Sequence, residues 1–358
     1  MAVEIEENVS LRAFNTFGMD VHARWFARFR TPEELRALLQ EPRVASAEKL
    51  ILGGGSNLLL TTDFEGLVLK NEIIDTVFID QPGNEVVVHA GGGLGWHALV
   101  EQTLDYGLSG LENLSLIPGT VGAAPLQNIG AYGVELQEVF EYLDAVELAT
   151  GATRRFLRAE CAFGYRESVF KNALKGQFVV TYVGLRLRRT APGFRLDYGD
   201  IRRTLTEMGV ADEHLTARAV SAAVQQIRRS KLPDPAIIGN AGSFFKNPEI
   251  SAAQFAALKA RFPDVPGYPL GPGPGPEQGE RVKVPAGWLI ERAGWKGHRR
   301  GARPADGGAT HGVHDRQALV LVNHGGAQGN EIWALAQEII QSVADRFGVT
   351  LAPEVNIL

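Results

Sequence analysis

The stretch ILGGGSNLLL, residues 51–60, sets three consecutive glycines, a serine and an asparagine between two apolar runs. A chain that dispenses with side chains at such a place either turns tightly or lets a ligand approach its backbone. Successive backbone N–H groups can converge on an anion when no Cβ blocks the approach. Since residues 58–61 predict another strand and not a helix, such an anion would be held by loop amides alone. The pattern leaves both interpretations open: a tight turn or a phosphate-binding loop.

A second glycine-rich stretch, SLIPGTVGAAPLQNIGAYG, occupies residues 115–133. It has too many glycines and prolines for a regular element and too many apolar residues for a solvated linker, so we expect an ordered, buried loop. Two such loops could clamp an extended dinucleotide between them. The structural alternative is a pair of tight turns under a domain interface.

A competing dinucleotide motif lies between the two loops. GLGWHA, residues 93–98, fits the G-x-G-x-x-A pattern of a Rossmann unit, after a predicted strand and before a predicted helix. The acidic residue that should grip a ribose is out of place, because Glu112 lies in a predicted loop and not at the end of a second strand. A Rossmann site is therefore the less favoured interpretation.

The composition is that of a folded, soluble protein of two or three domains, with 358 residues, 45% hydrophobic and 22% charged. The formal charge of -5 and the lack of a long basic block argue against broad binding to nucleic acid. The single cysteine, Cys161, is interpreted as a buried small hydrophobe and fits a reducing compartment. The first residues lack the basic and apolar regions of a signal peptide, and no apolar run approaches membrane-spanning length. We expect a cytoplasmic protein.

Hydrophobic periodicity and turn residues predict a mixed order of helices and strands rather than strict βαβα alternation. Thr31 is the predicted N-cap of the first helix, with Pro32 in its first turn. The predicted helices are 32–39, 96–106, 200–208, 217–231 and 330–347, and the predicted strands are 50–52, 67–70, 85–90, 143–148, 178–187 and 319–323.

Two later segments read as insertions. Residues 263–285 contain PLGPGPGPEQGE, whose Pro-Gly alternation should block both helices and sheet ladders, so we expect an exposed loop. Residues 296–312 are basic and glycine-rich and are expected to form a solvated loop. His311 and His314 form an H-x-x-H pair there, but without a thiol or a helical context we expect no metal site.

Eight motifs occur in the order seen in one known family. They are NTFGMD at residue 15, GGGSNLL at 53, LIPGTVGAAPLQNIGAYG at 116, FGYRESVFK at 163, KLPDP at 231, GNAGSFFKNP at 239, AGWLIERAGWKG at 286 and PEV at 353. They span nearly the whole chain, which by them resembles the UDP-N-acetylenolpyruvoylglucosamine reductases. LDYGDI at 196 is similar to the tyrosine-bearing loop of the longer subclass of that family.

The resemblance implies an α+β protein: an FAD-binding fold of the vanillyl-alcohol-oxidase type with two subdomains, plus a C-terminal α+β substrate-binding domain. The predicted limits are 1–76 and 77–230 for the subdomains and 231–358 for the third domain. The implied activity is that of a cytoplasmic flavoenzyme of peptidoglycan synthesis. It would use NADPH to reduce the enolpyruvyl ether of UDP-N-acetylglucosamine to UDP-N-acetylmuramate.

The resemblance also implies a cofactor site in which the glycine loops hold the pyrophosphate of FAD. On this view the three glycines of the opening stretch admit the diphosphate to the backbone. The implied cofactor-binding residues are Gly53, Gly54, Gly55, Ser56, Asn57, Gly119, Thr120, Gly122, Ala123, Asn128 and Gly130.

The implied reaction delivers hydride to the terminal vinyl carbon and leaves negative charge on the carbon beside the carboxylate. Preorganised donors at the carboxylate lower such a barrier, and a positioned acid must then deliver one proton. By the resemblance, Arg166 polarises the carboxylate, Ser243 donates the proton and Glu354 lies near the same carbon. A planar guanidinium suits the first task, and a protonated carboxyl could donate a hydrogen bond to an enolate.

The resemblance assigns further residues to the uridyl diphosphate or the sugar: Tyr132, Tyr198, Lys231, Asn247 and Gln317. Gln317 ends a stretch, GGATHGVHDRQ, that is longer here than in the family. The expected partners are the UDP-sugar substrate and NADPH, with no nucleic acid and no membrane, and we expect a monomer.

Two other functions stay open from the sequence. One is an FAD-dependent oxidase of the same fold that acts on another sugar acid, which the motifs GNAGSFFKNP and PEV argue against because such oxidases lack them. The other is a sugar-nucleotide binding protein without catalysis, which the presence of Arg166, Ser243 and Glu354 argues against.

Overall fold

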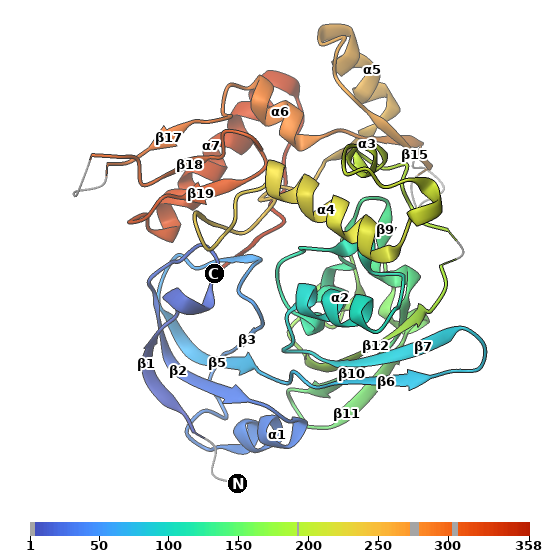
Figure 1. Cartoon of the computed structure of the whole chain (residues 1–358). Coiled ribbons are helices and arrows are strands. Elements are labelled where there is room, and N and C mark those ends of the chain that lie inside the picture. Colours follow the sequence, from blue (N-terminus) through green and yellow to red (C-terminus); the bar gives the residue numbers. More distant parts are fainter. Residues whose placement is uncertain (1–3, 192, 273–278, 303–306) are drawn as a thin grey trace. The chain divides into compact units, whose positions relative to one another are not determined.

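The computed structural model describes residues 4–191, 193–272, 279–302 and 307–358. They form two compact units (Figure 1). The first is built mainly from His22–Gly55 and Phe64–Ser230, and the second from Leu11–Val21, Ser56–Asp63 and Lys231–Leu358. Two short N-terminal segments therefore fold with the C-terminal part of the chain. The limits 1–76, 77–230 and 231–358 stay a prediction.

The first unit contains a four-stranded sheet in the order β1-β2-β5-β3. Strand β5 is parallel to both β2 and β3, whereas β1 is antiparallel to β2. Helix α1 begins as predicted, since the Thr31 hydroxyl accepts a hydrogen bond from the backbone N–H of Glu34. Leu35 and Leu38 of this helix share one buried cluster with residues of β5. The bounds are β1 Glu6–Ser10, β2 His22–Phe29, α1 Pro32–Gln40, β3 Lys49–Leu52 and β5 Phe64–Asn71.

A second sheet of the same unit is antiparallel throughout, in the order β11-β10-β12-β7-β6. Residues 115–133 are ordered and largely buried, as predicted, and include a 3-10 helix at Val121–Gln127. The strands are β6 Thr76–Asp80, β7 Glu85–Gly91, β10 Phe140–Glu147, β11 Thr153–Leu157 and β12 Phe178–Arg188, and a short hairpin pairs β8 Gly130–Ala131 with β9 Val134–Glu135. Three helices complete the unit: α2 Trp96–Asp105, α3 Ile201–Glu207 and α4 Ala217–Lys231.

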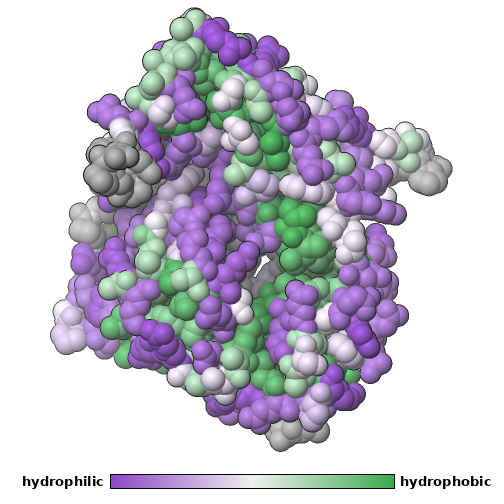
Figure 2. Space-filling model, turned by 180° about the vertical axis from the view of Figure 1, so that it is seen from behind, coloured by the Kyte–Doolittle hydropathy of each residue, from purple (hydrophilic) through white to green (hydrophobic). Residues whose placement is uncertain are grey.

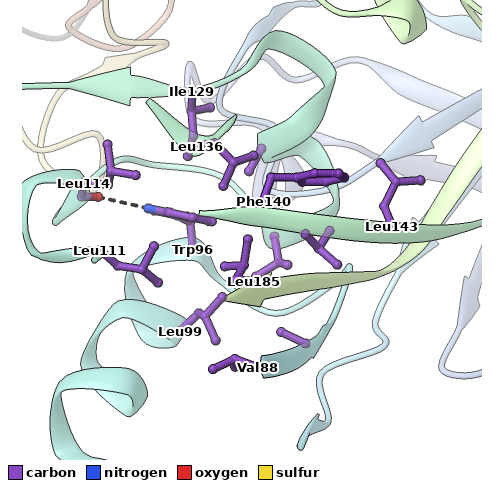
Figure 3. Packing of buried hydrophobic residues seen from close by; sticks show 14 of the residues in the cluster. Val88, Trp96, Leu99, Leu111, Leu114, Ile129, Leu136, Phe140, Leu143 and Leu185 are labelled. Carbon is purple, nitrogen blue, oxygen red and sulfur yellow. Dashed lines mark hydrogen bonds between the residues drawn. The ribbon is translucent and has the colours of Figure 1, made fainter. Parts of the chain in front are cut away.

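Trp96, the first residue of α2, lies in a hydrophobic core of the first unit (Figure 3). Its side chain is 1% exposed, and its indole N–H donates to the carbonyl of Leu114 at 2.9 Å. The hydrogen bond therefore connects the start of α2 to the segment that leads into the second glycine-rich loop. The ring fills space in the core, and its buried N–H has a hydrogen-bond partner.

Replacing Trp96 by phenylalanine should lower the free energy of unfolding by about 2 kcal/mol, because the smaller ring leaves a gap and the Leu114 carbonyl loses its donor. Urea denaturation followed by far-UV circular dichroism measures this loss. The matched control is Trp25→Phe on β2, where the ring is only half-buried beneath the Arg24 guanidinium, and where we expect a change below about 1 kcal/mol. Equal losses in both variants would contradict the role assigned to the buried hydrogen bond.

The second unit has its own sheet in the order β13-β19-β18-β17 and a two-stranded parallel pair of β4 and β20. Helix α7 begins and ends close to the predicted limits, and Gly348 ends it in the left-handed conformation at φ 69°. A three-stranded sheet, β14-β16-β15, accompanies α5. The bounds are β4 Leu58–Leu59, β13 Gly239–Asn240, β14 Glu249–Ser251, α5 Ala252–Arg261, β15 Tyr268–Pro272, β16 Glu280–Lys283, α6 Ala286–Arg292, β17 Arg299–Arg300, β18 His311–Val313, β19 Leu321–Asn323, α7 Gly329–Phe347 and β20 Asn356–Ile357.

Two predictions about the insertions were wrong in part. Strands β15 and β16 pair on either side of the Pro-Gly alternation, so residues 263–285 do form a ladder. Strand β15 lies at the edge of its sheet, where a proline without an N–H is tolerated. Residues 296–312 likewise contain the paired strands β17 and β18 instead of loop alone. The centres of both insertions, 273–278 and 303–306, lie outside the described residues.

The outer surface agrees with the expectation from composition. Figure 2 shows a face covered mostly by hydrophilic residues, with hydrophobic residues gathered in smaller patches. Among the described residues, no helix combines the length and apolar character needed to span a bilayer. The mixture of parallel and antiparallel sheets with helices confirms the predicted α+β class.

Candidate active site

The two glycine-rich loops of the first unit lie against each other. A Cβ added to Gly53 would come within 2.4 Å of the Thr120 hydroxyl oxygen, and one added to Gly54 would come within 3.0 Å of the Gly119 Cα. Glycine is thus required where the backbones approach. The prediction of paired loops is confirmed, although they are more than sixty residues apart in the sequence.

Several backbone amides at this junction have no acceptor in the part of the chain that the structure describes. The N–H groups of Gly54, Gly119 and Thr120 donate no hydrogen bond there, whereas Gly122 donates to the carbonyl of Gly92 at 2.9 Å. Gly122 also packs tightly, since its Cβ would meet that carbonyl oxygen at 2.9 Å. The junction therefore offers a cradle of small residues and spare donors, which suits a diphosphate.

The competing Rossmann motif lacks the surroundings of a dinucleotide site. Within it, the N–H groups of Gly93, Leu94 and Trp96 are used, by the carbonyls of Ile73, Gly91 and Gly119. Strand β7, which leads into the motif, is antiparallel to both neighbours, so no βαβ unit forms here. These glycines instead allow close packing, because a Cβ on Gly93 would lie 2.6 Å from the carbonyl oxygen of Asn71.

Lys70 lies beside the first glycine loop and was not predicted from the sequence. It stands on β5, and its ammonium donates to the carbonyl of Gly53 at 2.7 Å. Burial lowers the pKa of Lys70, while nearby Glu72 opposes that shift. The signal that could have found it is a lone lysine in the buried strand sequence LVLKN, since a buried ammonium needs a partner.

Left-handed backbone conformations of residues other than glycine gather around the second loop. Arg166 has φ 55°, and Leu116, Asn128 and Tyr132 have φ 56°, 42° and 51°. Each such residue costs free energy that surrounding contacts must offset, and residues of this kind cluster at functional sites. Arg166 is held by a hydrogen bond from its guanidinium to the carbonyl of Gly130 at 2.6 Å. The structure thus places the predicted catalytic arginine against the second loop.

Asn128 has a structural task in this loop. Its amide group donates to Glu135 at 2.8 Å and to the carbonyl of Gly164 at 3.0 Å, and its oxygen accepts from the N–H of Gln137. The side chain is completely buried. Its predicted contact with the cofactor therefore rests on the family resemblance, whereas the observed contacts fix the shape of the loop.

The two predicted substrate tyrosines of the first unit lie together. The rings of Tyr132 and Tyr198 meet edge to face, with centroids 6.5 Å apart, and Tyr198 is 62% exposed. Arg228 of α4 contacts Tyr132, and burial lowers the pKa of this arginine. The Nε of Arg228 is buried without a hydrogen-bond partner among the described residues. This second cation was also missed, because one arginine in an amphipathic helix gives no distinctive signal.

In the second unit, the structure pairs the segment that follows Ser243 with the segment that contains Glu354. Residues 244–246 run antiparallel to residues 352–354: the backbone N–H of Glu354 donates to the carbonyl of Phe244, and that of Lys246 to the carbonyl of Ala352. Gly242, at φ 70°, turns the chain just before Ser243. Both predicted catalytic side chains are half-buried. The backbone segments next to two of the three predicted catalytic residues are thus paired through a ladder that no sequence periodicity reveals.

Asn247 and Gln317 lie close to the same helix of the second unit. The side-chain oxygen of Asn247 accepts from the N–H of Ala286, the first residue of α6, at 2.9 Å. A Cβ on Gly287 would lie 3.3 Å from the side-chain oxygen of Gln317. Lys231, the last residue of α4, is exposed. The predicted roles of all three in binding substrate stay predictions.

The surroundings of His311, His314 and Cys161 indicate neither a metal site nor a reactive thiol within the described residues. His311 contacts the Thr310 hydroxyl at 2.9 Å, and burial lowers the pKa values of both His311 and His314. No group of three metal-ligating side chains occurs within the described ranges. Cys161 is buried and its pKa is raised to about 12, so the thiol is not a nucleophile at neutral pH.

Comparison with known proteins shows which family this chain belongs to. A family model described as "FAD binding domain" matches residues 23–157, and one described as "UDP-N-acetylenolpyruvoylglucosamine reductase, C-terminal domain" matches residues 234–358. The UDP-N-acetylenolpyruvoylglucosamine reductase of Burkholderia ambifaria (strain MC40-6) is 52% identical over 345 residues, which cover 96% of this chain and 94% of that protein. The chain belongs to the UDP-N-acetylenolpyruvoylglucosamine reductase family.

A second relative and a solved structure agree with this assignment. The UDP-N-acetylenolpyruvoylglucosamine reductase of Burkholderia pseudomallei (strain 1710b) is 51% identical over 353 residues, covering 99% of this chain and 97% of that protein. The crystal structure of the reductase from Thermus caldophilus matches with a TM-score of 0.64 and 24% identity over 100% of this chain and 99% of that chain. At this identity the solved structure supports the fold alone.

The family assignment confirms the predicted flavoenzyme. The reductase has an FAD-binding domain followed by the C-terminal domain of the family, and FAD is its cofactor. It is an oxidoreductase of peptidoglycan synthesis that acts on a UDP-sugar carrying an enolpyruvyl ether. The paired glycine loops lie within or next to the matched FAD-binding segment, and Ser243 and Glu354 lie within the matched C-terminal segment.

Proposed function

We propose that this reductase uses NADPH to convert the enolpyruvyl ether of UDP-N-acetylglucosamine to UDP-N-acetylmuramate, as a cytoplasmic monomer. The diphosphate of FAD lies in the cradle between residues 53–55 and 119–120. The observation that carries this placement is the junction itself, where only glycine fits and three amides have no acceptor among the described residues. Negatively charged oxygens would satisfy those amides.

The chain supplies the electrostatics and the proton of the reaction. Bound FAD supplies the hydride for the terminal vinyl carbon. Arg166, fixed against Gly130, polarises the substrate carboxylate and so stabilises the charge that develops beside it. The Ser243 hydroxyl donates the proton to that carbon, and the protonated carboxyl of Glu354, whose backbone N–H donates to the carbonyl of Phe244, donates a hydrogen bond to the enolate.

The remaining residues would hold the sugar nucleotide. Tyr198 is exposed and packs edge to face with Tyr132, so its ring and hydroxyl are accessible to a ligand. Lys231 is exposed at the end of α4 and carries the charge that a diphosphate requires. Asn247 and Gln317 are assigned to the same ligand.

The test of the proposed function uses colour. The purified protein should be yellow, should be bleached by NADPH without oxygen, and should regain its colour when the enolpyruvyl substrate is added. Colourless protein that binds the UDP-sugar would favour the non-catalytic alternative. Protein that is bleached by another sugar acid, and not reoxidised by the enolpyruvyl compound, would favour the oxidase.

Replacing Lys231 by alanine should raise KM for the UDP-sugar by about 10- to 100-fold with little change in kcat, because one charge-assisted hydrogen bond to the diphosphate is lost in ground and transition states alike. Steady-state kinetics at saturating NADPH measure KM for the UDP-sugar and kcat separately. Lys259→Ala, at an exposed position of α5, is the control and should leave both constants unchanged. A saturation curve unchanged in Lys231→Ala would count against the contact.

A further inference from the structure

Lys70 occupies a distinctive place under the first glycine loop. It stands opposite Leu52, the last residue of β3, so the chain turns into the loop directly beside it. The neighbouring acid, Glu72, is engaged by Arg28 at 3.4 Å and by Arg30 at 3.0 Å. Within the described residues Lys70 forms no ion pair. Its hydrogen bond goes to the Gly53 carbonyl, while Glu72 acts on its charge without forming an ion pair with it.

The bond to this carbonyl determines where the next amide points. In a trans peptide the carbonyl of one residue and the N–H of the next are directed to opposite sides. The structure has no cis peptide bond among its described residues, so the Gly54 N–H points away from Lys70 when the Gly53 carbonyl points towards it. The Gly54 N–H is one of the amides without an acceptor there, and its Cα faces the backbone of Gly119.

Without Lys70 this orientation would not be secured. Glycine rotates freely about both of its backbone dihedrals, so a peptide between two glycines can flip at small cost. A flip would exchange the N–H for a carbonyl oxygen and turn a donor towards an anion into a repelling dipole. An ammonium bonded to the carbonyl opposes the flip and also polarises the peptide, which makes the N–H a stronger donor.

We propose that Lys70 is a positioning residue of the cofactor site: it holds the Gly53–Gly54 peptide with its N–H towards the diphosphate and so makes the site selective for a flavin that carries a diphosphate. The inference rests on the proposed placement of the FAD diphosphate at the two loops. It assigns Lys70 no contact with the reacting atoms. Its effect is on which flavin binds and how tightly.

The experiment compares two flavins on the full-length chain after removal of bound flavin. Dissociation constants for FAD and for riboflavin, which has no phosphate, are measured by fluorescence quenching. Lys70→Met removes the charge and keeps the chain length, and Lys70→Arg restores the charge. The control is Lys49→Met on β3, a lysine that also donates to backbone carbonyls, of Ala45 and Ala47, in the same unit.

The proposal predicts that Lys70→Met weakens FAD about 10- to 100-fold, the loss expected for one charge-assisted hydrogen bond, and changes riboflavin affinity less than about threefold. Lys70→Arg should recover most of the FAD affinity, and Lys49→Met should alter neither flavin. Equal weakening of both flavins in Lys70→Met, or no weakening of either, would overturn the role of Lys70. A wild-type chain that binds FAD no better than riboflavin would instead overturn the placement of the diphosphate.

A second measurement covers the case in which Lys70→Met does not fold. The ratio of the two dissociation constants is then followed in the wild-type chain as the pH rises from 7 to about 10. Because burial lowers the pKa of Lys70 below that of an ordinary lysine, the preference for FAD should decline as the pH rises, while the charge of the diphosphate stays constant. A preference that does not change with pH would contradict the proposal.

Discussion

Replacing Ser243 by alanine should leave reduction of the enzyme by NADPH intact and slow its reoxidation by the enolpyruvyl substrate by about 10²- to 10⁴-fold. A positioned proton donor contributes roughly 10²- to 10⁴-fold to such a step, and alanine has no proton to give. The hydroxyl is not needed for the first half-reaction, because no proton is delivered to the enolpyruvyl carbon there. Anaerobic stopped-flow absorbance separates the two rates.

Ser243 is half-buried, and its replacement should not disturb the fold, so a change in either rate can be attributed to the lost hydroxyl. The residues that shape its loop act through their backbones and through Asn240, whose side-chain oxygen accepts from the N–H of Gly242 at 2.9 Å. Alanine at 243 disturbs none of these bonds, so the fold should persist. Ser243→Cys, which keeps an ionisable proton at the same place, should recover part of the lost rate. Equal damage to both half-reactions in Ser243→Ala would rule out the role of proton donor.

The features that the sequence predicts well are those set by neighbouring residues. Helix α1 has its cap, its proline and its apolar face within ten residues, and α7 ends at a glycine that can adopt positive φ. Strand β2, HARWFARF, was missed. Its arginines and histidine obscure the pattern of its apolar residues, and pairing with β1 on one side and β5 on the other makes it a strand. Its partner residues on β5 are more than forty residues away.

The candidate site also has some features that the local sequence predicts and others that depend on distant residues. The glycines of residues 53–55 are visible in the sequence because they form one run, and the motifs carry Arg166, Ser243 and Glu354 through the family resemblance. The contact between Gly53 and Thr120, the bond from Lys70 to Gly53 and the ladder that joins residues 244–246 to 352–354 are all non-local. Periodicity reports the exposure of a residue and not its partner, so these contacts required the structure.

The contact between the two loops predicts the second large effect: Gly54→Ala should lose FAD and yield protein that is almost colourless but folded. The added methyl would lie 3.0 Å from the Gly119 Cα, which is backbone and cannot rotate aside. The two loops must then move apart by several tenths of an ångström, and the Gly54 and Gly119 amides no longer converge on one diphosphate. We expect FAD affinity to fall at least about a hundredfold, which corresponds to about 3 kcal/mol, or one to two hydrogen bonds to charged oxygens.

Flavin retention after gel filtration, together with the dissociation constant from fluorescence quenching, measures the loss. The matched control is Gly279→Ala, since a methyl at Gly279 would meet nothing within 4 Å and that residue does not have a positive φ. It should stay yellow and keep the wild-type affinity. Because Gly54 is only half-buried, the midpoint of thermal unfolding of the two flavin-free variants should differ by less than about 3 °C. If Gly54→Ala keeps FAD as tightly as Gly279→Ala does, the diphosphate does not lie between these loops, and the cradle that only glycine fits is a packing feature alone.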